Sequence, residues 1–262
     1  MDYGNFNMDF MRRAEKVTRL NFRVDDVQTL DYKKEIQFLI TKYFFPNFDI
    51  ARYTTSRIDK ESLNKGIKAL KARGFRDFEL LHSYPLSGVG PAEMTLFYLC
   101  SSAYLGGGAS KGVDIFANGK KYEVKASVVS GDGKFVHQFK LGGTVILSDI
   151  ISNARELAIA AGHTVSGNEI SGTIIDDTKA KFPEDWEAQV DKPYRDRAAS
   201  YFKDQTAIFI NNNKQDPKAK NVPKAGAKTA ELGEIVAIKK VKKEDIFLGQ
   251  ITSNTIKPKV KI

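Results

Sequence analysis

The chain has 262 residues, 42% of them hydrophobic and 28% charged, which is typical of a globular protein able to bury a sizeable core. Its single cysteine, Cys100, excludes an intrachain disulfide and a zinc site built on several cysteines. The net charge of +9 favours a polyanionic partner, because neutralised phosphates release counterions. No apolar run reaches the roughly 18 residues of a membrane span, and the first residues lack the order of a secretory signal. We therefore expect an intracellular, cytoplasmic protein with no membrane contact.

The first 80 residues are expected to form a mainly helical region. Apolar side chains recur at helical spacing in residues 31–45 and 59–73, and these runs are followed by Pro46 and Gly74, which end helices. A further helix is expected around residues 9–20. The basic face of the 59–73 helix either touches DNA or is an ordinary solvated surface.

Residues 81–211 are expected to form the core of the protein. It begins with a helix over residues 91–105, which is apolar on most faces, is expected to be buried, and is ended by three glycines. The elements expected after it are strands over residues 113–117 and 121–129, an extension through 135–141, a helix over 144–161, a helix over 194–204 and a strand over 205–210.

Two segments differ from this core in composition. Residues 163–193 are polar and rather acidic, so a long loop or an insertion is expected there. Residues 212–262 are expected to be a lysine-rich linker followed by a β segment with strands at 235–239 and 257–262. Residues 214–262 hold 12 lysines, no arginine and 5 acidic residues. Lysine without arginine favours non-specific phosphate contact over bidentate reading of bases.

A hairpin is predicted in the middle of the core. Asn118 and Gly119 lie between two β-rich runs, and this dipeptide is the strongest short hairpin signal in a sequence. A two-residue turn there places Asp114 directly opposite Glu123. A four-residue loop preserves this register, whereas a three-residue loop breaks it. Because side chains alternate along a strand, both carboxylates and Lys125 then project from one face.

Two like charges at opposed strand positions destabilise a hairpin, so something must offset the repulsion of Asp114 and Glu123. Mg²⁺ does so, because it takes one or two carboxylates together with waters and phosphate oxygens. Lys125 also helps from the same face. The alternative is an ordinary exposed hairpin with charges on its wet face. The apolar opposite face and the buried helices on both sides favour a central hairpin.

At these residues the chain resembles the PD-(D/E)xK nuclease superfamily, over roughly residues 90–162. The family's mark is an Asp that ends one strand, then Glu or Asp, any residue and Lys on the next strand. The matching residues are Val113, which stands where the family's name has Pro, Asp114, Glu123, Val124 and Lys125. The resemblance implies an α/β (α+β) protein with a restriction-endonuclease-like core, in which helices flank a mixed central β-sheet. This chain adds the N-terminal helical region and a lysine-rich C-terminal β extension.

The resemblance also implies roles for individual residues. Asp114 and Glu123 would bind Mg²⁺, for which Mn²⁺ can substitute, and the backbone carbonyl of Val124 would add a ligand. Lys125 would orient the attacking water or stabilise charge growing on the phosphate. Glu93, in the preceding helix, would hold a second metal or a metal-bound water. The helix dipole alone also favours a Glu in that first turn.

The expected activity is therefore magnesium-dependent hydrolysis of phosphodiester bonds in DNA. A chain of this size suits a restriction enzyme acting as a homodimer, or a phage or mobile-element nuclease. The same motif serves a nuclease that acts on branched DNA or on ends. The alternative is a non-catalytic nucleic-acid-binding or virion-associated protein that retains the nuclease fold.

Overall fold

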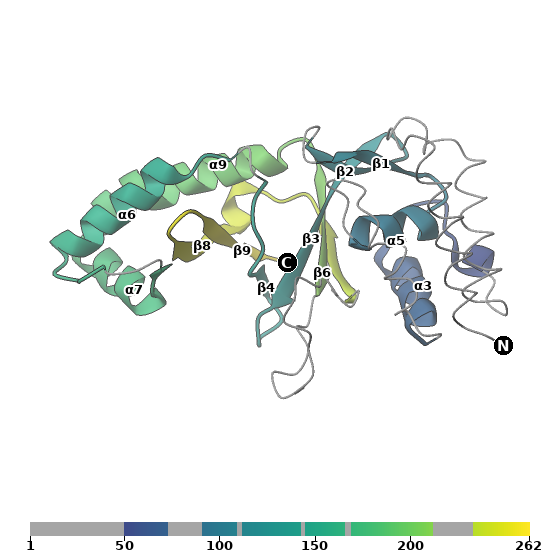
Figure 1. Cartoon of the computed structure of the whole chain (residues 1–262), viewed down its shortest axis with the longest axis horizontal. Helices are drawn as coiled ribbons and strands as arrows, with labels where there is room; N and C mark the ends of the chain where they lie inside the picture. The colour runs from purple at the N-terminus through teal and green to yellow at the C-terminus, as the bar shows by residue number, and fades with distance from the viewer. Residues whose placement is uncertain (1–49, 73–90, 109–111, 143–144, 166–168, 212–232) are drawn as a thin grey trace, which may run out of the picture. The chain divides into compact units, whose positions relative to one another are not determined.

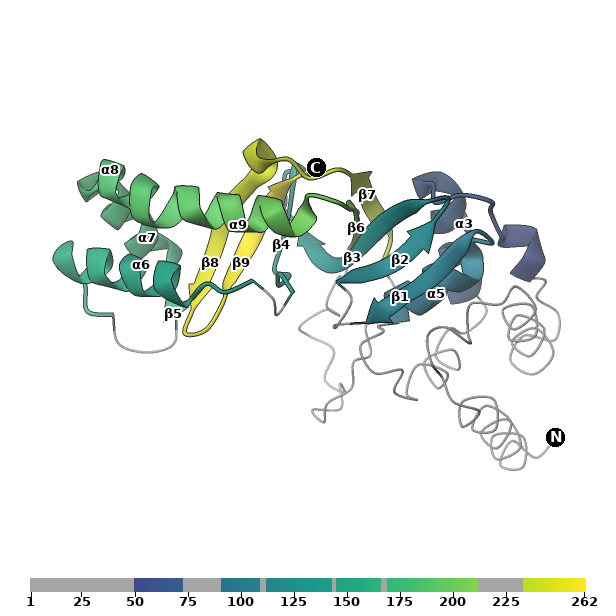
Figure 2. The same cartoon turned by 90° about the horizontal axis from the view of Figure 1, so that it is seen from above.

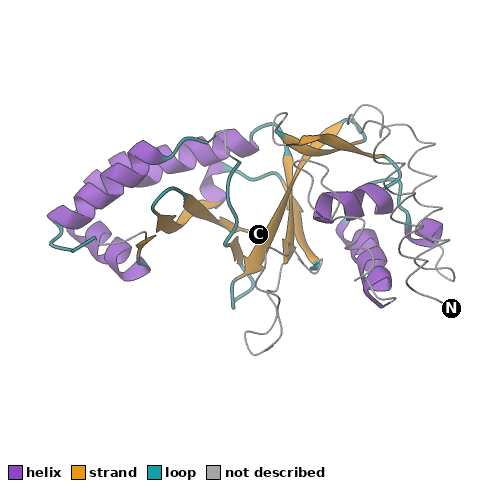
Figure 3. Cartoon of the chain, viewed as in Figure 1, coloured by secondary structure: helices purple, strands orange, loops and turns teal. Residues whose placement is uncertain are grey.

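A computed structural model of the chain describes residues 50–72, 91–108, 112–142, 145–165, 169–211 and 233–262. It is a mixed α+β structure in which helices flank a mostly antiparallel sheet (Figure 1, Figure 3). Within the described ranges, no helix is both long and apolar enough to cross a membrane. The helices predicted around residues 9–20 and over 31–45, and the linker predicted to begin at residue 212, lie outside these ranges.

The chain divides into two compact units, and the boundary falls inside strand β3 (Lys120–Val129). The part of β3 up to Tyr122 belongs to the first unit, and the part from Glu123 belongs to the second. The C-terminal residues from Ile235 also belong to the second unit. The division into regions 1–80, 81–211 and 212–262 stays a prediction. In the structure, a C-terminal strand pairs with a strand of the predicted core.

The first unit places two helices on one face of an antiparallel sheet (Figure 2). Its elements are η2 (Ile50–Tyr53), α3 (Lys60–Ala72), α5 (Pro91–Leu99), β1 (Ala103–Gly108), β2 (Val113–Ala117) and the start of β3. Helix α3 confirms the helix predicted over residues 59–73, and its apolar stripe at helical spacing is buried. At Gly66 a Cβ would lie 2.8 Å from the side chain of Leu99, so this glycine lets α3 and α5 pack closely.

The helix predicted over residues 91–105 is shorter than expected, and its prediction beyond Leu99 was wrong. Residues 95–100 are buried as predicted, but α5 ends at Leu99 and the chain then forms strand β1. The glycines read as a helix stop belong to this strand. At Gly106 a Cβ would lie 1.6 Å from the carbonyl oxygen of Val113. The strands β1 and β2 therefore approach so closely that no other residue fits there.

The second unit contains a larger antiparallel sheet. Strand β4 (Phe135–His137) pairs with β3 on one side and with β9 (Ile256–Lys261) on the other. Beyond β9 lie β8 (Ile246–Thr252) and then β5 (Glu169–Ile170). A separate branch runs from β3 through β6 (Thr206–Asn211) to β7 (Ile235–Lys239). The strands predicted over residues 205–210, 235–239 and 257–262 are confirmed, and residues 135–137 form a strand of their own.

Helices cover one face of the β8–β9 pair. Figures 1 and 2 show α6 (Ser148–Ala160) and α9 (Lys192–Phe202) side by side, with β8 and β9 to one side of them. They confirm the helices predicted over residues 144–161 and 194–204. The 3-10 helix η4 (Lys243–Asp245) connects to β8.

The long loop predicted over residues 163–193 was wrong, whereas the alternative of an insertion stays a prediction. After β5 this segment forms α7 (Gly172–Lys181), α8 (Pro183–Trp186) and the π-helix η3 (Glu187–Asp191). Its apolar residues are few, but they recur every three or four positions and turn to one side. The buried residues of this stripe, which continues into α9, are Ile175, Trp186, Val190, Tyr194, Ala198 and Phe202. Together with the inner faces of β4, β8 and β9 they form the core of the second unit.

Candidate active site

The turn that the sequence predicts at Asn118 and Gly119 is present. Both residues have positive φ, 50° and 71°, as a two-residue type I′ hairpin turn requires. The strands pair Ala117 with Lys120 and, at the other end, Ile115 with Tyr122. The predicted register of the β2–β3 hairpin is therefore confirmed over these pairs.

The predicted site residues divide between the two units. Asp114 lies on β2 and is half-buried, and Glu93 lies in the first turn of α5 and is also half-buried; both belong to the first unit. Glu123, Val124 and Lys125 lie on β3 in the second unit. The structure brings Glu123 and Lys125 into direct contact. The closeness of Asp114 and Glu93 to them remains a prediction.

Glu123 is a nearly fully buried carboxylate with two charged or polar partners. It is 3% exposed. Its Oε1 atom lies 2.5 Å from the Nζ atom of Lys125 and also accepts a hydrogen bond from the hydroxyl of Tyr201. The Lys125 ammonium lies 5.2 Å from the centre of the Tyr201 ring. The three side chains therefore form a cluster, which we call the Glu123 cluster. Such a carboxylate is not a charge on the wet face of an exposed hairpin.

The cluster keeps its lysine positively charged. Burial lowers the pKa of Lys125, but the Glu123 carboxylate and the Tyr201 hydroxyl raise it by more, so that the pKa lies above its ordinary value. Burial also raises the pKa of Tyr201, and the negative charge of Glu123 raises it further, while Lys125 lowers it. At neutral pH the cluster thus holds an ammonium group and a neutral hydroxyl donor, both directed at one carboxylate oxygen.

Tyr201 is the member of the cluster that sequence reasoning missed. It lies in the last turn of α9, and its ring is held against the backbone of Gly142, where a Cβ would be 2.9 Å from Cε2. It also lines an open pocket between the starts of α6 and the end of α9. The other lining residues are Val145, Ile146, Ser148, Asp149, Asp196, Arg197 and Ser200. No spacing in the sequence links Tyr201 to Glu123, so only the packing of α9 reveals the pair.

The available donors fit a hard cation. Carboxylate oxygens such as those of Asp114 and Glu123, and a backbone carbonyl such as that of Val124, are the ligand types that Mg²⁺ accepts. In the ranges that the structure describes, no group of three or more His, Cys, Asp or Glu side chains is placed to hold a metal. A site with one or two carboxylates completed by water and phosphate is compatible with that finding, because Mg²⁺ usually keeps several waters.

Comparison with known proteins gives no relative: no protein-family model, no curated protein and no solved structure matches the chain. The candidate site therefore stands on its own geometry and on the motif in the sequence.

Proposed function

We propose that the chain is a magnesium-dependent DNA endonuclease with a restriction-endonuclease-like core, and that Asp114, Glu123 and Lys125 are its catalytic residues. The observation that carries the proposal is the Glu123 cluster. A buried carboxylate and ammonium are costly to desolvate, and apolar residues of similar volume usually stabilise a fold as well or better. A buried pair of this kind on a central strand is therefore a candidate for function.

Two further observations support the assignment. The confirmed β2–β3 register ends at Ile115 and Tyr122. Asp114 and Glu123 are the next residues along the two strands, so a hairpin that kept this register would bring the two carboxylates together. The Glu-x-Lys spacing also matches the contact found, because residues two apart on a strand share a face and Glu123 touches Lys125.

The residues have distinct roles in the proposed reaction. Asp114, Glu123 and the carbonyl of Val124 would hold Mg²⁺, which when bound polarises the phosphate and lowers the pKa of a bound water. Lys125 would donate hydrogen bonds to the oxygens on which negative charge grows, and its raised pKa keeps it able to do so. Tyr201 would hold the Glu123 carboxylate in place. The role of Glu93 as a further acid stays part of the same proposal.

The test uses supercoiled plasmid with Mg²⁺, and with EDTA as the blank. We expect the wild type to cleave with Mg²⁺ and not with EDTA. Asp114→Asn, Glu123→Gln and Lys125→Ala should each lower the rate of cleavage about 100-fold or more, as removal of an electrostatic catalytic group does. Lys121→Ala is the matched control, because Lys121 is an exposed lysine on the same strand. It should cleave like the wild type.

The same assay contains the outcomes that contradict the proposal. Cleavage at the wild-type rate by any of the three site variants refutes the assigned roles. If the wild type leaves duplex, single-stranded and branched DNA intact, the nuclease proposal is refuted and the alternative of a binding protein that retains the fold is favoured.

A further inference from the structure

The sheet of the second unit has a second face, turned away from the helices. On β9 the buried residues Ile256, Pro258 and Val260 alternate with Lys257, Lys259 and Lys261. Ile256 and Val260 belong to the core that includes residues of α9, so the lysines lie on the opposite face of the strand. On β8, Phe247 is on this face as well and is 43% exposed. We call this surface, formed by β4, β9 and β8, the lysine face.

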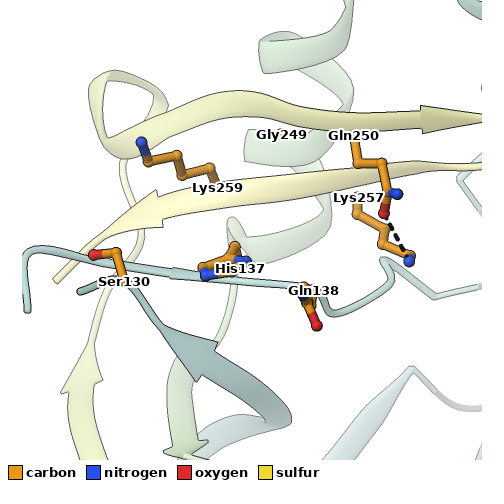
Figure 4. Close-up of a pocket in the computed structure, with 7 residues that line it drawn as sticks. All are labelled: Ser130, His137, Gln138, Gly249, Gln250, Lys257 and Lys259. Carbon is orange, nitrogen blue, oxygen red and sulfur yellow. Dashed lines mark hydrogen bonds between the residues drawn. The ribbon is translucent and has the colours of Figure 1, made fainter. Parts of the chain in front are cut away.

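A pocket of about 370 Å³ opens in the lysine face (Figure 4). That volume is within the range of small-molecule sites, about 300–1,000 Å³. Figure 4 shows two lysines from β9 and a glutamine from β8 around it, above the end of β4. Its lining residues are Ser130, His137, Gln138, Gly249, Gln250, Lys257 and Lys259. All seven are polar, basic or glycine, and none of these seven is acidic.

The two lysines of the pocket keep their charge available. Lys257 donates to the side-chain oxygen of Gln250 at 2.8 Å, which is a neutral partner. The ammonium of Lys259 lies 4.2 Å from the centre of the Phe135 ring. Among the described residues, no ion pair joins either lysine to a carboxylate. The nearby acids are used elsewhere: Glu169 accepts from Gln250, and Asp132 accepts from Ser130. The pocket therefore offers two positive charges to an anion.

An aromatic ring lies directly beside these charges. Phe247 is paired with Lys259 across the β8–β9 ladder. The rings of Phe247 and Phe135 form a T-shaped pair with a centroid distance of 5.8 Å. An exposed ring next to cations on an open sheet is the combination that binds single-stranded nucleic acid, because the ring stacks on a base while the cations hold phosphates. A duplex keeps its bases stacked on one another and cannot use the ring.

We propose that the lysine face binds single-stranded nucleic acid, with Lys257 and Lys259 on consecutive phosphates and Phe247 stacked on a base. Ser130, His137 and the amides of Gln138 and Gln250 supply hydrogen bonds within the pocket. The net charge of +9 adds long-range attraction for the same ligand. The proposal does not depend on cleavage, because a binding protein without nuclease activity would use the same surface.

The test measures binding of labelled oligo(dT) by fluorescence anisotropy with the full chain in EDTA, over a series of salt concentrations. Oligo(dT) should bind more tightly than a duplex of equal length. Replacing both Lys257 and Lys259 by Gln should weaken binding at least about tenfold and reduce the salt slope by about 1.4, the value for two phosphate contacts on a single strand. Phe247→Ala should weaken binding about fivefold or more with an unchanged salt slope, because stacking releases no counterions.

The matched control replaces Lys192 and Lys203, two exposed lysines on and just after α9, by Gln. It removes the same charge from another surface. Only the general loss of net charge should act there, so the affinity should stay within about twofold of the wild type. Circular dichroism of every variant checks that the fold is kept. Equal losses in both double variants would overturn the proposal, as would tighter binding of duplex than of oligo(dT). Equal competition by poly-glutamate would do so too, because it would show a face selective for charge alone.

The outcomes separate this proposal from the proposed nuclease activity. If the Lys257 and Lys259 double variant still cleaves DNA and binds oligo(dT) with normal affinity, the nuclease proposal stands and the proposed binding role of the lysine face is refuted. If the wild type never cleaves DNA but its binding depends on the lysine face, the binding proposal stands and the nuclease proposal is refuted.

Discussion

Two tyrosines of α9 differ in whether the hydroxyl group has a partner. The Tyr201 hydroxyl donates to Glu123, whereas the hydroxyl of Tyr194 is buried and has no hydrogen-bond partner among the described residues. Burial also raises the pKa of Tyr194 well above its ordinary value, so this hydroxyl stays neutral. A buried polar group without a partner costs free energy, while a hydrogen bond to a charged group stabilises. Removing the two hydroxyl groups is therefore expected to change the free energy of unfolding in opposite directions.

We expect Tyr194→Phe to raise the free energy of unfolding by about 1 kcal/mol, because it removes the unpaired hydroxyl and keeps the ring. Tyr201→Phe should lower it by about 1.5–3 kcal/mol, because the Glu123 carboxylate loses a donor. Urea unfolding of the wild type and the two variants at neutral pH measures both changes. A shift in the same direction for both variants would show that the ring environment, and not the hydroxyl partner, decides stability.

The three residues of the Glu123 cluster differ in whether the sequence predicts their contacts. Glu123 and Lys125 are two positions apart on one strand, so their contact follows from local alternation and was predicted. Tyr201 reaches Glu123 across 78 positions, and its approach depends on Gly142 giving room to the ring. A contact of that kind is set by tertiary packing, which has no local pattern in the sequence.

At the scale of elements, an ion pair joins the start of α6 to α9. Both amino groups of the Arg197 guanidinium donate to the two oxygens of Asp149, each at 2.5 Å. The hydrogen bond from Arg197 is the main cause that lowers the pKa of Asp149 to about 2. Both side chains are well exposed, so the pair contributes only about 0.2–1 kcal/mol.

The pair predicts a defined pH dependence. The folded-state pKa of Asp149 lies below its unfolded value of 3.8, so the stabilisation is present above that value and is lost as the pH falls through about 2. The stability difference between wild type and Asp149→Asn should therefore shrink between pH 4 and pH 2 in urea unfolding experiments. Asp176→Asn, on an exposed position of α7, is the control and should show no such trend. A difference that stays constant over this range would contradict the assignment to Asp149.

Elements with one strong local signal were predicted well. The hairpin follows from Asn118 and Gly119, and α3 follows from its apolar stripe. The helices in residues 163–193 were missed because acidic and polar residues outnumber the buried ones, which still recur every three or four positions. Strand β1 was missed because its glycines read as a helix stop, whereas Gly106 is needed where the Val113 carbonyl passes. In both cases the contact that determines the structure is made with another element of the chain.

Over the whole chain, lysines are concentrated toward the C-terminal end, and the strands found there are part of the sheet of the second unit. Strand β9 pairs with β4 and β8, and its buried residues complete the core of the second unit. The lysines are therefore held on a regular surface at fixed spacing along a strand. Their alternation with core residues is why the lysines of β9 are part of a folded unit.

Strand β3 belongs to both compact units, and this has a consequence for cutting the chain into complementing fragments. A break at the unit boundary, after Tyr122, severs the strand that both halves share. A break between Asn118 and Gly119 falls in an exposed turn and leaves β3 whole. Exposed turn tips tolerate such breaks, because no ladder hydrogen bond is lost.

We therefore expect co-expressed fragments 1–118 and 119–262 to copurify as a folded pair, and fragments 1–122 and 123–262 to fail. Affinity capture through a tag on one fragment, followed by circular dichroism, measures this. Equal recovery of the two pairs would show that the halves do not need an intact β3. If only the first pair assembles, the folded protein can be reconstituted from two fragments that meet at the turn at Asn118.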